Sequence, residues 1–328
     1  MACYIVTGGA GFIGSHISTA LVARGDSVRV VDDLSSGKLE NLSHLQVGPL
    51  GSGASVEFVQ ASVTDAEAVR KAFEVPLETE ETPRGVFHEA AQVSVPQSVA
   101  EPERSYAVNV MGTLNVLEAC KQHGVKRCVF AASAAAYGAS EEVPKCETMP
   151  TDPCSPYASG KLAGEELLRV WARLADMHTV ALRYFNVFGP RQADDSPYTG
   201  VIAIFARRLI DKKPITIFGD GEQTRDFVFI DNVVSANLLA MDADAASGKV
   251  MNIGTGVRVS LHQLYEAMCE YLGSDQKPSY GEARTGDVRH SLASIDRAQT
   301  LLEYEPQVHW KVGLGRTLDW YKQGSGTG

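Results

Sequence analysis

A glycine-rich turn between two short apolar strands begins this chain. Residues 3–6 are mostly apolar, residues 7–14 read TGGAGFIG, and a helix with Ile13, Ile17 and Leu21 on one face follows. Residues 28–33 then form a second apolar strand whose acidic end, Asp32, comes 18 residues after Gly14. A glycine triplet alone is weak evidence, but in this strand, turn, helix, strand order it predicts a βαβ unit that binds a dinucleotide.

Each glycine has an expected task. Gly8 allows the tight turn, Gly11 lets a pyrophosphate approach the backbone, and Gly14 lets the helix pack against the strand. The N-terminus of the helix offers unpaired N–H groups and the positive end of its dipole to phosphates.

The acid after the second strand indicates which dinucleotide binds. A carboxylate at Asp32 accepts hydrogen bonds from ribose hydroxyls and repels a 2′-phosphate, so the sequence favours NAD over NADP. Arg29 and Lys38 are nearby cations that weaken this preference.

Composition excludes several classes of function. The net charge of −10 and the pI of about 5.3 argue against a nucleic-acid or anionic-membrane partner. No charged and apolar leader and no 18-residue apolar run is seen, so we expect a cytoplasmic protein without a membrane span. The six cysteines lack CxxC spacing, which favours free thiols over disulfides or a zinc site, and we expect no bound metal.

Strands alternate with helices to about residue 185, which predicts an α/β fold with a doubly wound parallel sheet of the Rossmann type. We expect strands at 3–7, 28–32, 56–60, 85–88, 127–132 and 179–183, and helices that include 65–74, 105–123 and 156–176. We therefore predict a dinucleotide-binding domain over 1–185. A smaller α/β substrate-binding lobe is expected over 186–328, with some chain crossing back. In the lobe we expect strands 215–218 and 250–253 and helices 199–211, 231–242 and 260–272.

A second motif lies where one of these helices begins. Ser155 is a good N-cap and Pro156 suits the first helical position, so Tyr157 and Lys161 stand at i and i+4 on one helix face. A lysine ammonium one turn away, and a cationic nicotinamide, would favour the phenolate and make Tyr157 a base. This YxxxK spacing occurs often by chance, so it gains weight only from its neighbours.

Ser133 is such a neighbour, because it ends the apolar strand Val129-Phe130-Ala131-Ala132. That position is at the carboxyl edge of the sheet, where ligands of such folds bind. A serine there can hydrogen-bond a substrate oxygen and relay a proton to Tyr157.

Along nearly its whole length the chain resembles the sugar-nucleotide epimerase/dehydratase family of extended short-chain dehydrogenases/reductases. The matching stretches are TGGAGFIG (7–14), VVDD (30–33), HEAAQVSV (88–95), NVMGT (109–113), AASAAAYG (131–138), YASGK (157–161), LRYFNVFGPRQ (182–192), IFGDGEQTRDF (217–227) and RTGDVRHS (284–291). Within the family it is most similar to UDP-hexose 4-epimerases.

The resemblance implies a set of site residues. The catalytic group would be Ser133, Tyr157 and Lys161. NAD would be held by Gly8, Gly11, Phe12, Ile13, Gly14, Asp32, Asp33, Ser62, Val63, Ala90, Ala91, Gln92, Asn109, Tyr157, Lys161 and Tyr184. The UDP-sugar would be held by Ser133, Tyr157, Asn186, Val201, Ile217, Arg225, Arg284, Asp287 and Ser291, with Arg191 a weaker candidate for the diphosphate.

Two details narrow the reaction and the substrate. Ala134 and Ala135 follow Ser133 where family dehydratases place proton-transferring groups, so the resemblance favours epimerisation through a transient 4-keto sugar. Ser291 stands where epimerases of non-acetylated hexoses tend to carry tyrosine, which leaves room for a 2-acetamido group. We expect activity on UDP-GlcNAc/UDP-GalNAc, on UDP-Glc/UDP-Gal, or on both. Ser291 as an ordinary small surface residue is an equally weighted interpretation.

Two residues depart from the family pattern. Ser62 stands where an aspartate usually reaches the adenine. Glu89 stands inside the HEAA stretch where a neutral residue is usual, and the sequence leaves open whether its carboxylate affects the nicotinamide or points away.

Other functions remain open at this stage. They are a UDP-uronic acid 4-epimerase, a dehydratase, and a non-catalytic NAD-sensing regulator, against which the intact Ser133, Tyr157 and Lys161 argue. The resemblance also implies a homodimer joined by helices near 92–120 and 155–175, although the sequence does not exclude a monomer.

Overall fold

Seven parallel strands form the central sheet of the computed structural model, which describes residues 2–74, 82–193, 200–283 and 288–324. Across the sheet the strands follow the order β11 (Lys249–Ile253), β6 (His178–Tyr184), β5 (Arg127–Ser133), β4 (Gly85–His88), β1 (Cys3–Thr7), β2 (Ser27–Asp32) and β3 (Val56–Gln60). Six of these lie within a residue or so of the strands expected in the first 185 residues. The predicted Rossmann-like α/β class is confirmed.

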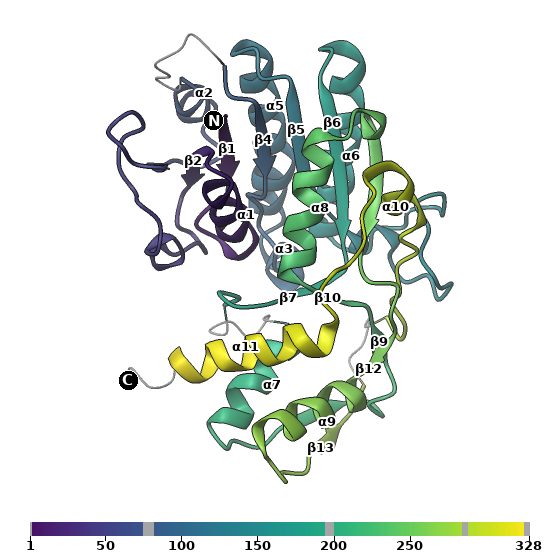
Figure 1. Ribbon diagram of the computed structural model, residues 1–328. Helices are drawn as coiled ribbons and strands as arrows, with labels where there is room; N and C mark the ends of the chain where they lie inside the picture. The colour runs from purple at the N-terminus through teal and green to yellow at the C-terminus, as the bar shows by residue number, and fades with distance from the viewer. Residues whose placement is uncertain (1, 75–81, 194–199, 284–287, 325–328) are drawn as a thin grey trace.

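Helices cover both faces of the sheet (Figure 1). On one face lie α1 (Phe12–Ala23) and α8 (Ile230–Asp242), and on the other α2 (Ala66–Ala72), α5 (Gly112–Gln122) and α6 (Pro156–Leu174). Side chains of a strand alternate between faces. Tyr4 and Val6 therefore pack into the core with α1, while Ile5 packs into the core with α2 and α5.

A smaller lobe lies beyond the carboxyl edge of the sheet (Figure 1). It contains helices α7 (Val201–Ile210), α9 (Leu261–Leu272) and α11 (Trp310–Gly324) and the strand pairs β8 (Thr216–Phe218) with β13 (Ser279–Gly281) and β9 (Thr224–Arg225) with β12 (Val259–Ser260). The pair β7 (Asn186–Phe188) with β10 (Phe227–Phe229) lies between the two parts.

Two elements expected in the lobe belong to the large sheet instead. The chain crosses back after β10, so α8 packs on the sheet and β11 pairs with β6 as its edge strand. We expected some chain to cross back but assigned these two elements to the lobe, because a short apolar strand has the same pattern in either part.

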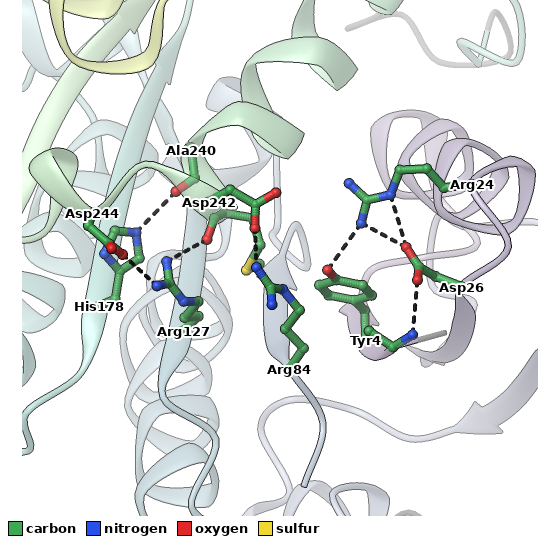
Figure 2. Close-up of polar contacts among 11 residues, drawn as sticks. Tyr4, Arg24, Asp26, Arg84, Arg127, His178, Ala240, Asp242 and Asp244 are labelled. Carbon is green, nitrogen blue, oxygen red and sulfur yellow. Dashed lines mark hydrogen bonds and ion pairs between the residues drawn. The ribbon is translucent and has the colours of Figure 1, made fainter. Parts of the chain in front are cut away.

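Ion pairs at the amino edge of the sheet hold the returning segment (Figure 2). Arg84, just before β4, pairs with Asp242 at the end of α8, and Arg127 of β5 pairs with Asp244 and donates to the Met241 carbonyl at 2.8 Å. The ring of His178, at the start of β6, bonds the Ala240 carbonyl at 3.1 Å. Strand beginnings are therefore tied to the C-terminal end of α8.

The expected helix 105–123 is present as three contiguous helical segments. They are α4 (Pro102–Tyr106), a π-helical segment (Ala107–Met111) and α5. The remaining elements are α3 (Val95–Ala100), α10 (Asp296–Leu302) and three 3₁₀ turns (Leu39–Leu42, Ala134–Tyr137, Asp244–Ala246). We did not expect α10 or α11, whereas α3 falls within the helices expected near 92–120. Within the described ranges, no helix is long and apolar enough to cross a membrane.

Candidate active site

The carboxyl edge of the sheet gathers the polar residues that the sequence singled out. Gly8 follows β1, Asp32 ends β2, Glu89 follows β4, Ser133 ends β5 and Tyr184 ends β6. Ser133 and Tyr184 are register partners across β5 and β6. Parallel pairing brings all strand ends to one edge, so five separate segments contribute to one site.

The glycine turn has the geometry expected of a phosphate cradle. Gly8 adopts a φ of 67°, and a Cβ there would lie 2.6 Å from the Ala90 amide nitrogen. A Cβ on Gly14 would lie 2.3 Å from the Gly8 carbonyl oxygen, whereas one on Gly11 would meet only that oxygen, at 3.1 Å. The backbone at Gly11 is thus open to a ligand, and it leads into α1.

The start of α1 has no side chain that caps it. Gly11 is the N-cap residue, and it has no side-chain oxygen to offer the first N–H groups, which belong to Phe12 and Ile13. These donors and the positive end of the helix dipole are available to a phosphate.

Asp32 and Asp33 lie where the adenosine half of a dinucleotide is expected. Asp32 is 8% exposed and accepts hydrogen bonds from the Ala10 amide at 3.0 Å and the Leu34 amide at 2.8 Å. Its burial raises the pKa of the carboxyl, and these hydrogen bonds oppose the rise. For Asp33, partial burial raises the pKa, but hydrogen bonds from Ser35 and Ser62 lower it by more. Ser62 thus contacts Asp33.

Asn109 shapes the loop after β4. It lies in the π-helical segment and is 2% exposed; its side chain accepts from the Gln92 amide at 2.9 Å and donates to the Gln92 carbonyl at 3.1 Å. The segment containing Ala90, Ala91 and Gln92 is therefore held against the helix. Val63, 5% exposed, is held similarly, because its carbonyl accepts from Asn115 at 2.9 Å.

Tyr157 and Ser133 meet at the end of β5. Tyr157 is the second residue of α6, whose N-cap Ser155 accepts from the Ala158 amide, as the sequence predicts. Ser133 Oγ accepts from the Ala135 amide at 3.2 Å, which leaves its O–H to donate to Tyr157. Burial raises the pKa of Tyr157; the Ser133 hydrogen bond lowers it, and the Glu89 charge raises it.

The Lys161 side chain contacts strand β5, whereas the sequence analysis related it to Tyr157. Its Nζ donates to the Ala131 carbonyl at 2.7 Å and lies 4.9 Å from the centre of the Phe130 ring, and its side chain is buried. Burial lowers the pKa of Lys161 to about 8, and the Glu89 carboxylate opposes that change. The ammonium of Lys161 is thus directed at strand β5, and the causes that shift the Tyr157 pKa are burial, Ser133 and Glu89.

The sequence left open where the Glu89 carboxylate points. In the structure its charge acts on Tyr157 and Lys161. Its Oε1 accepts a hydrogen bond from the Tyr184 hydroxyl at 2.9 Å. Asn237 of α8 donates to the same hydroxyl at 2.8 Å. Sequence analysis missed Asn237; the available signal was a polar residue one turn from Val233 on the apolar face of α8.

Some of the residues expected to bind the UDP-sugar lie close together in the lobe. Arg225 of β9 donates to the Thr224 carbonyl at 2.9 Å, and the Ser291 amide bonds that same carbonyl at 3.0 Å. Asn186, half-buried in β7, bonds the Asp226 carbonyl through its amide. Arg284 and Asp287 lie outside the described residues.

Three other residues that were expected to bind the UDP-sugar do not lie in this cluster. The Ile217 side chain is fully buried in the core, so it leaves only its backbone for a ligand, and Val201 is the half-buried first residue of α7. Arg191 donates to Thr19 of α1 at 3.1 Å and contacts His44 at 3.2 Å, so it faces α1.

The residues present fit NAD. The glycine turn would hold the pyrophosphate, Asp32 the adenosine ribose, and the strand ends from β4 to β6 the nicotinamide. Gln92 Oε1 is a buried acceptor without a partner in the described residues. The fold and site define an NAD-dependent enzyme of the short-chain dehydrogenase/reductase class.

Comparisons with known proteins narrow the class. Residues 4–254 match the model of the NAD dependent epimerase/dehydratase family, and the chain belongs to this family. It is 39% identical over 322 residues to a UDP-glucose 4-epimerase of Mycolicibacterium smegmatis, covering 98% of this chain and 99% of that protein.

Two solved structures have the same fold along nearly their whole length. One is a UDP-glucose 4-epimerase of Thermotoga maritima with UDP-glucose (TM-score 0.90, 40% identity, 98% of this chain and 99% of the other). The other is a UDP-N-acetylglucosamine 4-epimerase of Methanobrevibacter ruminantium in complex with UDP-N-acetylmuramic acid (TM-score 0.90, 36% identity, 98% and 99%). The predicted family and NAD-dependent isomerase class are confirmed.

Proposed function

We propose that this protein is a UDP-hexose 4-epimerase that uses tightly held NAD. The observation that carries the proposal is the placement of Ser133, at the end of β5, beside Tyr157 of α6, at the edge of the sheet that faces the lobe containing Arg225. Ala134 and Ala135 offer no group for a proton transfer at C5 or C6, so the site suits chemistry at C4 alone.

Each residue of the site has its own role in the proposed reaction. Tyr157 takes the proton of the 4-hydroxyl, and Ser133 hydrogen-bonds the same oxygen and relays that proton. NAD, when bound, accepts the hydride from C4 and returns it, so no net oxidation results. Arg225 pairs with the diphosphate, for which a planar guanidinium is well suited. Rotation of the 4-keto sugar between the two transfers gives the epimer.

Ser291 is our candidate for substrate selection. Its backbone amide bonds the Thr224 carbonyl, next in the chain to Arg225, so it lies beside the strand that carries the proposed diphosphate ligand. A small hydroxyl there leaves space beside the sugar for a 2-acetamido group. We therefore propose that UDP-GlcNAc/UDP-GalNAc are substrates together with UDP-Glc/UDP-Gal.

A substrate panel tests these assignments. The purified protein is incubated with UDP-Glc, UDP-GlcNAc and UDP-glucuronate without added NAD, and the epimers are separated. We expect turnover of the hexoses, loss of about 10²–10⁴-fold in Tyr157→Phe, and co-purified NAD in both proteins. Ser291→Tyr should abolish the acetylated activity and spare the other. Turnover of UDP-glucuronate alone would contradict the substrate assignment, and activity of a protein free of NAD would contradict the cofactor role.

We infer that the protein acts as a homodimer. Exposed apolar side chains gather in and around α3, α4 and the π-helical segment, namely Val93, Val95, Val99, Tyr106 and Met111, which are 41–64% exposed. These elements pack against α6, which carries Tyr157. An isologous contact between two copies would cover this surface.

We also propose the cytoplasm as its location. None of the six cysteines, all within the described residues, forms a disulfide, and Cys3, Cys120 and Cys128 are buried thiols. This state is typical of a reducing compartment. Cell fractionation with immunodetection tests it, and recovery in an extracellular fraction with oxidised thiols would contradict it.

A further inference from the structure

Glu89 occupies the junction between the glycine turn and the catalytic tyrosine. A Cβ built on Gly8 would come within 2.9 Å of the Glu89 carbonyl carbon, so the two backbones are in direct contact. On its other side, the carboxylate accepts the hydrogen bond from Tyr184. Its charge acts on both Tyr157 and Lys161. The half-buried carboxylate thus lies between the part of the site that holds a dinucleotide and the part that performs the chemistry.

The position of Glu89 is maintained by several elements. Its amide donates to the Thr7 carbonyl at 3.1 Å, which joins the end of β4 to β1. The Tyr184 hydroxyl that bonds its carboxylate is itself held by Asn237, whose amide nitrogen also donates to the Val233 carbonyl at 2.9 Å. The hydroxyl lies within donating distance of Glu89 Oε1, at 2.9 Å, and of Asn237 Oδ1, at 3.1 Å. The carboxylate is therefore oriented by β6 and α8, which supports a specific role for it.

The charge of Glu89 opposes the base that the reaction needs. It raises the pKa of Tyr157 and so disfavours the phenolate. The groups that face it are Tyr157 and Lys161 of α6, Tyr184 of β6 and Asn237 of α8. Burial raises the pKa of Glu89 to about 7, whereas the Tyr184 hydrogen bond and Lys161 favour its ionised form. Because this charge hinders proton removal by Tyr157, we looked for a step of the reaction that it favours.

The geometry points to Glu89 as the residue that biases the bound dinucleotide towards its oxidised form. Hydride transfer moves two electrons from the sugar C4 to the nicotinamide, whose ring changes from cationic to neutral, while the hydroxyl proton goes to Tyr157. The reverse transfer restores both. A fixed carboxylate stabilises only the cationic ring, so it favours return of the hydride to the keto sugar. The inference rests on the proposed function, because favouring the oxidised dinucleotide matters in an enzyme that must return its hydride to the sugar.

The test compares the affinities of the two cofactor forms. Protein stripped of nucleotide is titrated with NAD⁺ and with NADH at about pH 8, above the pKa of about 7 for Glu89. The variants are Glu89→Gln, which keeps an acceptor for Tyr184, Glu89→Asp, which keeps the charge, and Glu270→Gln, which removes an exposed carboxylate from α9.

We expect Glu89→Gln to weaken NAD⁺ binding by about tenfold or more with little change for NADH, equivalent to about 30 mV for a two-electron couple. Glu89→Asp should restore most of the preference, and Glu270→Gln should match the wild type. Equal weakening of both forms would show that Glu89 only shapes the site and would overturn the inference, as would no change in either. Because no UDP-sugar is present, the result is independent of the substrate panel.

Discussion

At the residue scale, burial determines which protonation states the site tolerates. His88 ends β4 with no exposed surface, and its ring contacts the Thr7 hydroxyl at 2.6 Å and the Thr113 hydroxyl at 3.1 Å. Burial, followed by the nearby Lys161 charge, lowers the pKa of His88 to about 3. The folded protein therefore keeps this imidazole neutral, beside the glycine turn.

A loss of stability in mild acid follows from the His88 pKa. Between about pH 6.5 and 3 the unfolded chain binds a proton that the folded chain does not, so the free energy of unfolding falls as pH falls. The contribution of one such group is about 1.4 kcal/mol per pH unit. Denaturant unfolding across this range should show a smaller slope in His88→Gln than in the wild type. The exposed His309→Gln serves as control, and an unchanged slope in His88→Gln would refute the assignment.

At the element scale, one face of α6 connects the chemistry to the sheet. Tyr157, Lys161 and Glu165 follow one another at intervals of four residues, and Glu165 forms a buried ion pair with Arg183 of β6 at 2.7–2.8 Å. The two side chains are 3% and 5% exposed. This pair fixes α6 against the strand that ends in Tyr184.

Breaking the buried pair should therefore cost far more than breaking a surface pair on the same helix. Glu165→Gln leaves the Arg183 charge buried, and we expect a loss of about 3–5 kcal/mol. The neighbouring Glu166→Gln breaks the exposed pair with Arg169 and should cost about 1 kcal/mol or less. Chemical denaturation of both variants measures the difference. Similar small losses would mean that Glu165 does not anchor α6.

At the scale of the whole molecule, the apolar surface of α3, α4 and the π-helical segment is the place for assembly. Val99→Glu puts a charge at the centre of this surface, and we expect it to shift a dimer to monomer in sedimentation or light-scattering measurements. Val312→Glu, at an exposed position of α11, is the matched control and should leave the mass unchanged. A wild-type protein that is monomeric at micromolar concentration would contradict the proposed dimer.

Much of the fold and of the nucleotide site could be predicted because it depends on local spacing. The TGGAGFIG turn, the alternating apolar strands and the i, i+4 placement of Tyr157 and Lys161 each involve a few neighbouring residues, whose relation follows from strand and helix geometry. The glycine turn and Asp32 indicated NAD, and the family resemblance added the reaction class. Gly8 and Gly14 occupy the conformation and close contacts that their positions in the motif indicate.

Only the tertiary structure decided relations between residues distant in the chain. The return of α8 and β11 to the large sheet, the Ala131 carbonyl as the partner of Lys161, and the contact of Glu89 with Tyr184, 95 residues away, leave no local pattern. Burial also decided the charges, because it raises the pKa of Tyr157 and lowers that of Lys161. The sequence by itself determined which groups reach the carboxyl edge, and packing determined which of them meet there, since desolvation and pairing depend on neighbours in space.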